Sequence, residues 1–471
     1  MGTGLSNERR MSRRQMLRVA AGSGLAALLA ACGSPATPAG QGGQSSQGEA
    51  QAPAASSSPV EIRLTAWGDV TDKQVYDQIV AAFAKVEPNI KVTVEQYPGG
   101  YYEKIQANFA AGTPADVIYF QGFSWQPYAE RELLLPLDDY IRQDSMSGAW
   151  PDIPNYNDNT KWHGQTFMSA ADTGSVVMFY SKELFDKAGV PYPTSDWTYS
   201  DFQRAVEQTT REEAGVQYYG YAQAAGWNGT YLRSIHWMRM NGQLEWDNIV
   251  EPREARWTQP EIIDALQYTV VDVIARGLCP SPATIDGGGV SIGTGRVAMT
   301  MEGPWALAQM QGPDAAKEGG VAFDVVAPPK GSTGTNETIA EVHGHVIAKA
   351  SKNPDAAWKV LKFILSDEAQ QIIAQGGRMC GTPENIERYW VPIAEKTYNF
   401  TNAKAFADAM RTGRNPIISG AGANYDAMAG PSTPLAVAWD AMLAGTSAKE
   451  AIERAQPELQ KILDAYWAKK G

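Results

Sequence analysis

Val60-Glu61-Ile62-Arg63-Leu64-Thr65-Ala66 opens the stretch of sequence that decides the fold. Apolar and polar side chains alternate through it, which predicts a β-strand with one buried face. Apolar residues at helical spacing follow from Val75 to Val86, and a second alternating strand runs from Ile90 to Val94. Another helix is expected over 102–109, and the β-forming residues 116–120 predict a short buried strand. This strand–helix–strand–helix–strand order predicts a parallel sheet with helices on both faces.

The same pattern continues along the rest of the chain. A strand-like run from Ser175 to Tyr180 precedes a helix that begins at Lys182. Helical spacing of apolar residues predicts long helices over 355–375 and 448–468, and Pro457 should kink the second. Residues 60–471 show no repeat of about 20–50 residues and no apolar run of about 20 residues. We expect one unit or two lobes of α/β type.

The composition bounds the class of protein. The chain has 471 residues, of which 44% are hydrophobic and 20% are charged, so it holds enough apolar material for a core. Its net charge of −12 at pH 7 repels a phosphate backbone, and we therefore expect no nucleic-acid partner. The 14 tryptophans supply more flat apolar surface than core packing requires.

Residues 1–31 are typical of an export signal. A basic segment that ends at Arg18 precedes an apolar run from Val19 to Ala31, which is too short to span a bilayer. The pair Arg13-Arg14 resembles a twin-arginine signal. Met16 stands where that motif has phenylalanine, so the general secretory route stays open.

A cysteine closes this signal. Leu29-Ala30-Ala31-Cys32-Gly33 resembles a bacterial lipobox, which implies a diacylglycerol on Cys32 and a membrane anchor through its acyl chains, worth about 0.8 kcal/mol per CH₂. The alternative is an ordinary signal peptide with a chance cysteine. Residues 33–59 are small or polar with the single charge Glu49, so residues 32–59 are expected to be a lipidated cysteine and a flexible tether.

The other cysteines, Cys279 and Cys380, lie far apart in the sequence and in no metal or redox spacing. We expect free or structural thiols, with a disulfide as the alternative that export permits.

Histidine and glycine patterns give little support for catalysis. The chain has no His-Glu-x-x-His and no Walker A sequence, and no Lys-Ser/Thr follows the glycine-rich stretch 287–295. In a strand, His343 and His345 would share one face, so we expect two polar strand-end side chains instead of a metal site. We expect no cofactor, no metal and no catalytic residue, although no local pattern can reveal a pair of catalytic carboxylates.

Several stretches between residues 61 and 370 match the elements of one family in order. They are Trp67-Gly68-Asp69, Ala111 to Ile118, Phe179 to Phe185, Gly295 to Trp305, and Ala357 to Gln370. Together they resemble the extracellular solute-binding proteins of ABC importers, in the branch that includes maltose-binding protein. Residues 114–115 depart from it, because proline and alanine are in the reverse of the commoner order.

The resemblance implies a two-lobed α/β fold of the periplasmic-binding-protein type, with a hinge and a ligand cleft between the lobes. By the family's layout, the first lobe would hold residues 60–171 and 326–355. The second would hold residues 172–325 and 356–471.

The resemblance also implies a ligand site that combines aromatic and polar groups, as sugars require. Trp305 aligns with the tryptophan that packs on sugar in the family, and Trp227-Asn228 takes the place of an acidic-aromatic pair. The missing acid departs from the maltodextrin pattern. The other expected cleft residues lie on the first-lobe side, after the third strand, at the first lobe crossing or on the returning segment: Asp69, Tyr102, Phe120, Gln121, Ser124, Asp172, Thr173, Gly174, His343 and Gly344. For each, packing or turn formation is the plainer alternative.

We therefore expect a substrate-binding lipoprotein of an ABC transporter. It would capture a mono- or oligosaccharide and deliver it to a membrane permease, as a monomer held at the outer face of the cytoplasmic membrane. One alternative keeps the fold but binds a glycerophosphodiester, a polyamine or another polar solute, with Arg378 as the candidate phosphate ligand. Another is an exported glycoside-active enzyme, which needs two carboxyl groups facing each other across the cleft.

Overall fold

The computed structural model describes residues 59–97, 99–223, 227–286, 290–310, 322–415 and 432–470, with backbone only for 227–232, 286, 308–309 and 470. These residues all belong to one compact unit, Ser58–Gly471. The expected signal peptide of residues 1–31, Cys32 and nearly all of the expected tether lie outside the described residues. Among the described helices, none is long and apolar enough to cross a membrane.

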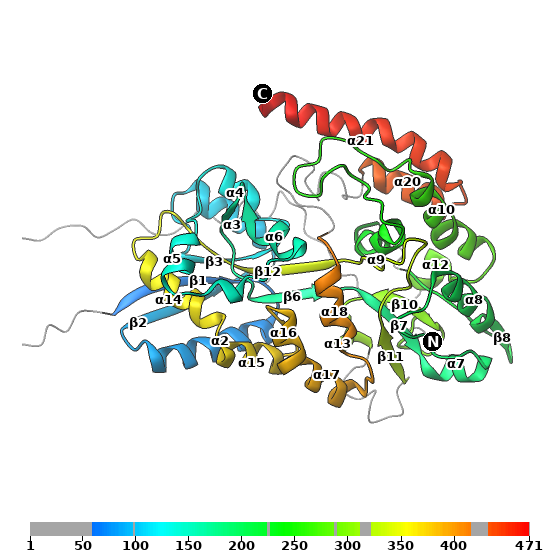
Figure 1. The fold of residues 1–471 in the computed structure, drawn as a ribbon, viewed down its shortest axis with the longest axis horizontal. Helices are drawn as coiled ribbons and strands as arrows, with labels where there is room; N and C mark the ends of the chain where they lie inside the picture. The colour runs from blue at the N-terminus through cyan, green and yellow to red at the C-terminus, as the bar shows by residue number, and fades with distance from the viewer. Residues whose placement is uncertain are drawn as a thin grey trace, which may run out of the picture. The chain divides into compact units, whose positions relative to one another are not determined.

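A six-stranded sheet carries the first half of the fold (Figure 1). Its strand order is β13(Met379–Cys380), β6(Asp172–Ser175), β12(Ala340–Ile347), β3(Val117–Gln121), β1(Val60–Ala66) and β2(Ile90–Gln96). The three N-terminal strands pair in parallel, which confirms the predicted strand–helix–strand unit. The remaining three pairings are antiparallel, so the prediction of a parallel sheet holds for only half of it. The antiparallel half forms because β12 returns from far along the chain to pair between β3 and β6.

The helices α2(Val70–Val86) and α3(Tyr101–Ala110) connect the parallel strands. Asp69 begins α2, because its carboxylate accepts hydrogen bonds from the amides of Thr71 and Asp72. The helix expected over 355–375 is two helices, α14(Pro354–Ile364) and α15(Asp367–Gln375). Ser366 separates them, since its side chain caps the amide of Ala369.

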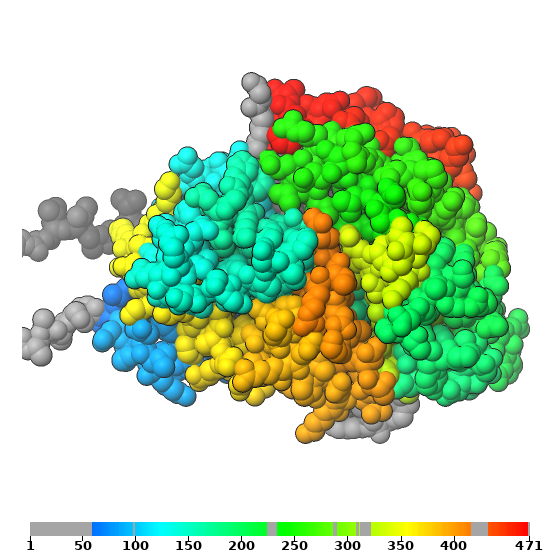
Figure 2. All heavy atoms as spheres, viewed as in Figure 1, coloured from blue at the N-terminus to red at the C-terminus, as the bar shows by residue number. Residues whose placement is uncertain are grey.

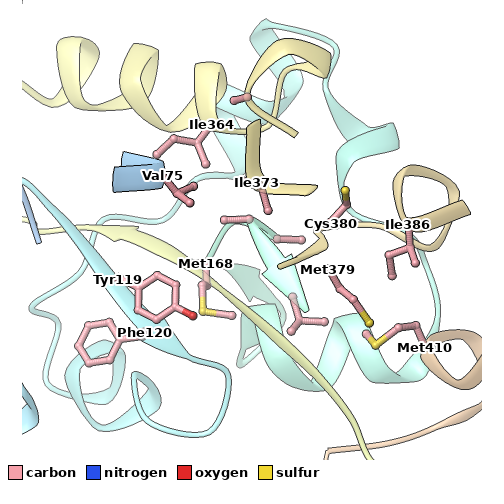
Figure 3. Packing of buried hydrophobic residues seen from close by; sticks show 14 of the residues in the cluster. Val75, Tyr119, Phe120, Met168, Ile364, Ile373, Met379, Cys380, Ile386 and Met410 are labelled. Atoms are coloured by element: carbon pink, nitrogen blue, oxygen red, sulfur yellow. The ribbon is translucent and has the colours of Figure 1, made fainter. Parts of the chain in front are cut away.

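Both of these later helices pack against the first part of the chain. α15 contacts α2, and α14 contacts α2, β1 and β12. Val75 of α2 shares one core with Ile364 and Ile373 of the later helices (Figure 3). On the face drawn in Figure 2, the yellow atoms of this part of the chain lie beside the blue and cyan atoms of the N-terminal segment. The family's layout places residues 356–471 in the second lobe, and within that range lie α15 and most of α14, which pack on α2 of the expected first lobe.

A second, three-stranded antiparallel sheet has the order β10(Met299–Glu302), β7(Val177–Ser181), β11(Phe323–Val326). Side chains alternate along its central strand. Val177 and Phe179 belong to the core cluster of the large sheet, whereas Met178 and Tyr180 belong to a second cluster. Because strand residues alternate between faces, β7 gives one face to each apolar core.

The second core is mainly helical. Its C-terminal part consists of α20(Pro434–Leu443) and α21(Ala448–Lys470), which pack on each other. Pro457 lies inside α21, and the helix continues through it. The two cysteines expected to be free thiols, Cys279 and Cys380, are buried and unpaired, as expected.

Shorter elements complete the two halves. They are α4(Gln126–Glu130), α5(Asp138–Gln143), η1(Ser147–Ala149), α6(Pro154–Thr160), β4(Lys161–Trp162), β5(Gln165–Thr166), α7(Lys182–Ala188), α8(Tyr199–Thr209), β8(Arg211–Glu213), β9(Val216–Tyr218), α9(Trp227–Arg239), α10(Pro260–Leu266), η2(Gln267–Asp272), α11(Val273–Ala275), α12(Pro282–Asp286), η3(Pro304–Ala306), α13(Leu307–Met310), α16(Pro383–Asn385), η4(Ile386–Trp390), α17(Val391–Tyr398) and α18(Ala405–Thr412).

Candidate functional site

A cavity of about 270 Å³ lies where the six-stranded sheet meets the turn after β10. Strands β3, β6, β12 and β13 supply most of its wall, and η3, Trp67 after β1 and Gly377 and Arg378 before β13 supply the rest. Its lining is Trp67, Tyr119, Gln121, Asp172, Thr173, Gly174, Pro304, Trp305, Glu341, His343, Gly377, Arg378 and Met379. The lining combines aromatic rings with carboxyl, amide, imidazole and guanidinium groups.

The register of the sheet gathers the polar groups. His343 on β12 lies opposite Gln121 on β3 and Asp172 on β6, so the three side chains share one face. Glu341, two residues before His343, lies on that face opposite Gly174. The register therefore builds a polar strip across three strands. Strand β12 lies more than 150 residues after β3 and β6 in the sequence.

Arg378 ties this strip together. Its Nη1 donates to Oδ1 of Asp72 at 2.8 Å, and its Nη2 donates to the Tyr119 hydroxyl at 3.1 Å and to Oδ1 of Asp172 at 3.4 Å. The Tyr119 hydroxyl in turn donates to Asp172 Oδ1 at 3.2 Å. One guanidinium thus holds two carboxylates, and the network fixes the side-chain positions of Asp172 and Tyr119.

Burial shifts the protonation of the strip. Loss of water raises the pKa of Asp172, and the charge of Arg378 and the Tyr119 hydroxyl oppose this rise. Burial alone raises the pKa of Glu341 to about 7. Burial, helped by the charge of Arg378, lowers the pKa of His343 to about 3. At neutral pH the strip therefore presents a neutral imidazole beside a carboxyl group that ionises near pH 7.

Glu341 and His343 keep hydrogen-bonding capacity for something other than the protein. Glu341 is 4% exposed and His343 is 7% exposed. Glu341 Oε2 lies 3.5 Å from His343 Nε2. Glu341 Oε1 and His343 Nδ1 are buried and have no hydrogen-bond partner among the described residues. Buried polar atoms normally find partners, so these two atoms are candidates to meet a ligand.

Trp305 forms the apolar wall. Its side chain is 43% exposed, unusual for so large an apolar group. The ring lies close to two glycines: a Cβ on Gly303 would come within 2.3 Å of ring carbons, and one on Gly174 within 2.9 Å. The preceding Glu302 anchors the turn, because its Oε2 accepts from Arg233 Nε at 2.7 Å and its Oε1 from the Gly303 amide at 2.8 Å. The turn thus holds an exposed ring against the sheet.

The structure brings many of the sequence-predicted residues into this cavity. They are Gln121, Asp172, Thr173, Gly174, Trp305, His343 and Arg378. Five others lie elsewhere. Asp69 caps α2, the Tyr102 hydroxyl donates to Gln121 Oε1 at 2.9 Å, and the Ser124 hydroxyl donates to the Gln121 carbonyl at 2.8 Å. Tyr102 and Ser124 therefore contact Gln121 and do not line the cavity themselves.

Phe120 and Gly344 were expected in the cleft and are not in the cavity wall. Phe120 is fully buried, with its ring 6.2 Å from that of Tyr102 and 5.2 Å from that of Tyr128. Its neighbours Tyr119 and Gln121 face the cavity, and alternation along β3 turns Phe120 the other way. Gly344 alternates with His343 in the same manner and packs against the backbone of Ser169.

The predicted pair Trp227 and Asn228 begins α9, but its side chains lie outside the described residues. Six other wall residues were not predicted as site residues from the sequence: Trp67, Tyr119, Pro304, Glu341, Gly377 and Met379. Strand alternation could have found Tyr119 from Gln121 and Glu341 from His343.

No described group of three or more His, Cys, Asp or Glu side chains could hold a metal ion. One stretch, Gly289-Val290-Ser291-Ile292-Gly293, matches the Gly-x-Ser-x-Gly pattern of a nucleophile elbow. That motif needs a strand-to-helix turn. Ser291 instead lies in a bend followed by a turn through Gly295, where its amide donates to Thr294 Oγ1 at 2.9 Å. The pattern therefore lacks the backbone that would make this serine a nucleophile.

Comparison with known proteins places the chain in a family. Residues 67–371 match the family described as bacterial extracellular solute-binding protein. A putative binding protein of Brucella abortus is 23% identical over 334 residues, which cover 67% of this chain and 74% of the relative.

Solved structures agree with this match. The sugar-binding protein MalE from Xanthomonas citri superposes with a TM-score of 0.71 at 19% identity, covering 87% of this chain and 99% of MalE. An ABC substrate-binding protein from Listeria monocytogenes, in complex with cycloalternan, superposes with a TM-score of 0.68 at 22% identity, covering 86% and 99%. These likenesses confirm the two-lobed α/β fold expected from the sequence.

Proposed function

Because this chain belongs to the bacterial extracellular solute-binding protein family, we propose that it binds a carbohydrate in the cavity beside Trp305 and delivers it to an ABC permease. One observation carries the proposal: an exposed tryptophan ring lies beside a strip of buried polar groups. A sugar presents C–H faces that pack on an aromatic ring and hydroxyls that need donors and acceptors. The two similar solved structures, a sugar-binding protein and a complex with cycloalternan, support this class of ligand.

In this proposal the protein performs no chemistry. The ligand enters the cleft between the lobes, its face packs on Trp305, and its hydroxyls reach Asp172, Gln121 and His343. Hinge closure follows because the ligand binds the closed state more tightly than the open one. The closed monomer would then dock on the permease, with Cys32 and the tether holding it at the outer face of the cytoplasmic membrane.

A phosphate-bearing ligand is less well supported than a neutral sugar. The candidate phosphate ligand, Arg378, already contacts Asp72, Tyr119 and Asp172 through both terminal nitrogens. An added phosphate would have to compete with these two carboxylates for one guanidinium. This argues against a glycerophosphodiester.

The enzyme alternative is also less well supported. A glycosidase needs two carboxyl groups on opposite sides of the scissile bond. In this cavity the carboxyl side chains of Asp172 and Glu341 come from adjacent strands of one sheet and share one wall. The opposite wall holds Pro304 and Trp305, and the nearby Glu302 is paired with Arg233.

Thermal unfolding tests the proposal. At least one mono- or oligosaccharide should raise the midpoint temperature of unfolding of the purified full-length protein. Glycerophosphodiesters should leave that temperature unchanged. At 100 times Kd the expected stabilisation is about 2.7 kcal/mol, and it should grow with ligand concentration. The sugar should be recovered intact after long incubation. Stabilisation by no sugar, or steady cleavage of one, would contradict the proposal.

A further inference from the structure

The cavity wall carries more negative than positive charge. Of the described residues that line it, Arg378 alone has a permanent positive charge. Two carboxylates, Asp72 and Asp172, already share that guanidinium. Glu341 adds a third carboxyl group to the same site, and His343 beside it is neutral at pH 7. Among the described residues, three carboxyl groups at this site therefore share one permanent cation.

Among these three carboxyl groups, Glu341 is the one that Arg378 does not contact. It is 4% exposed, and its Oε1 has no hydrogen-bond partner among the described residues. Its Oε2 lies 3.5 Å from Nε2 of His343. A buried carboxyl without a cation is costly when ionised, and its pKa of about 7 is the expected consequence.

The surroundings of Glu341 suit a cationic group. Gly174 lies opposite it on β6 and brings no side chain, and the Trp305 ring lies close to this glycine. Three aromatic side chains, Trp67, Tyr119 and Trp305, line the same cavity. Aromatic faces attract ammonium groups, and do so more strongly when water is excluded. Carboxyl and aromatic groups together favour a cation over an anion.

We propose that the ligand carries a protonated amino group and that Glu341 binds it, which makes an amino sugar the preferred class of carbohydrate. This inference rests on the proposed carbohydrate-binding function and narrows it. A neutral hydroxyl can accept a hydrogen bond from the protonated carboxyl, but only an ammonium group supplies the missing charge. A uronate or a sugar phosphate would add a further negative charge to the site.

Calorimetric titration at pH 7 tests this inference with the full-length protein. The panel consists of glucosamine and its oligomers, the matching N-acetyl compounds, glucose and its oligomers, glucuronate, and putrescine as an amine without a sugar ring. We expect an amino sugar to bind at least about tenfold more tightly than its N-acetyl counterpart. Glu341→Gln should remove that preference, because it keeps the size of the side chain and loses the charge. Glu212→Gln, at an exposed position on β8, is the matched control and should change nothing.

The outcomes separate this inference from the proposed function. A neutral sugar that binds as tightly as its amino counterpart, or an amine preference that survives Glu341→Gln, overturns the inference and leaves carbohydrate binding intact. Binding of putrescine without any sugar supports the amine chemistry and contradicts carbohydrate binding. Absence of binding by every amine in the panel overturns the inference.

Discussion

The two walls of the cavity are built in opposite ways. The sheet wall consists of buried side chains on strands, tied together by Arg378 and its contacts to Asp72 and Asp172. The other wall is a short turn that presents Trp305, which is 43% exposed. Strand register fixes the sheet wall, whereas Glu302 anchors the turn through its ion pair with Arg233 and its hydrogen bond from the Gly303 amide.

This difference teaches which property each wall can supply. A rigid strip of polar groups discriminates between ligands, because an unmatched donor, acceptor or charge is costly when buried. An exposed aromatic ring supplies contact area to any ligand with an apolar face. We therefore expect substitutions in the sheet wall to change stability and specificity, and substitutions in the turn to change affinity.

Removal of Arg378 should have the largest effect. Arg378→Met leaves Asp172 buried at 4% exposure without its counter-charge. Loss of one partner of a buried ion pair costs about 3–5 kcal/mol, so the free energy of unfolding should fall by about that amount in a denaturant titration. Arg388→Met breaks an exposed pair with Asp367 and is the control, with an expected loss below about 1 kcal/mol. Equal small losses in both variants would show that the Arg378 network does not hold the sheet wall together.

Glu341→Gln should stabilise the protein at high pH. The pKa of Glu341 is raised to about 7 from 4.5, so between these pH values the folded protein holds a proton that the unfolded chain has released. Stability is therefore lost as pH rises through this window. The glutamine side chain does not titrate. The free energy of unfolding of the variant should therefore exceed that of the native protein by an amount that grows from near zero at pH 4.5 to at most about 3 kcal/mol at pH 8. Unfolding curves measured across this range check the prediction, and a pH-independent difference contradicts it.

Trp305→Ala should show the difference between the two walls most clearly, because we expect it to change affinity much more than stability. Loss of the exposed ring should weaken sugar binding by about 2 kcal/mol, or roughly 30-fold, because a central aromatic contact disappears. The free energy of unfolding should change by less than about 1 kcal/mol, since much of the ring is already exposed. Calorimetry and denaturant unfolding measure the two quantities on the same sample. Trp305→Phe should retain part of the affinity, and an alanine variant that binds normally would remove the turn from the site.

Substitution of Glu302, which anchors the turn, should have the smallest effect on sugar affinity. Glu302→Gln removes the charge that pairs with Arg233 but keeps a side chain of the same size. We expect sugar affinity to fall by about 1 kcal/mol, or five- to tenfold, because the Trp305 ring is held less firmly. Glu207→Gln, in an exposed pair with Arg276, serves as the control and should leave binding unchanged. An unchanged affinity in Glu302→Gln would show that the two glycines beside the ring are enough to position it.

Local sequence patterns predicted part of this arrangement. Alternation and helical spacing found β1, β2, β3 and the two helices between them, because each depends on neighbours along the chain. Trp305 and Asp172 were reached through family motifs, and both line the cavity. Arg378 was reached as a phosphate ligand, and in the structure it pairs with carboxylates.

Contacts between distant segments explain what the sequence did not predict. Pairing of β12 with β3 and β6 is set by the tertiary fold, so alternation could place Glu341 on the same face as His343 but could not place it opposite Gly174. Phe120 shows a different limit. Its position near the end of β3 was predicted. Alternate residues of a strand point to opposite faces of the sheet, and in β3 the residues that face the cavity are Tyr119 and Gln121.

A crystal structure of the protein with the tightest-binding sugar of the panel tests the central claim most directly. We expect the sugar ring between the two walls, with its C–H face packed on Trp305 and polar groups within hydrogen-bond distance of Glu341 and His343. A sugar bound away from Trp305, or one that leaves Glu341 Oε1 without a partner, would contradict the account.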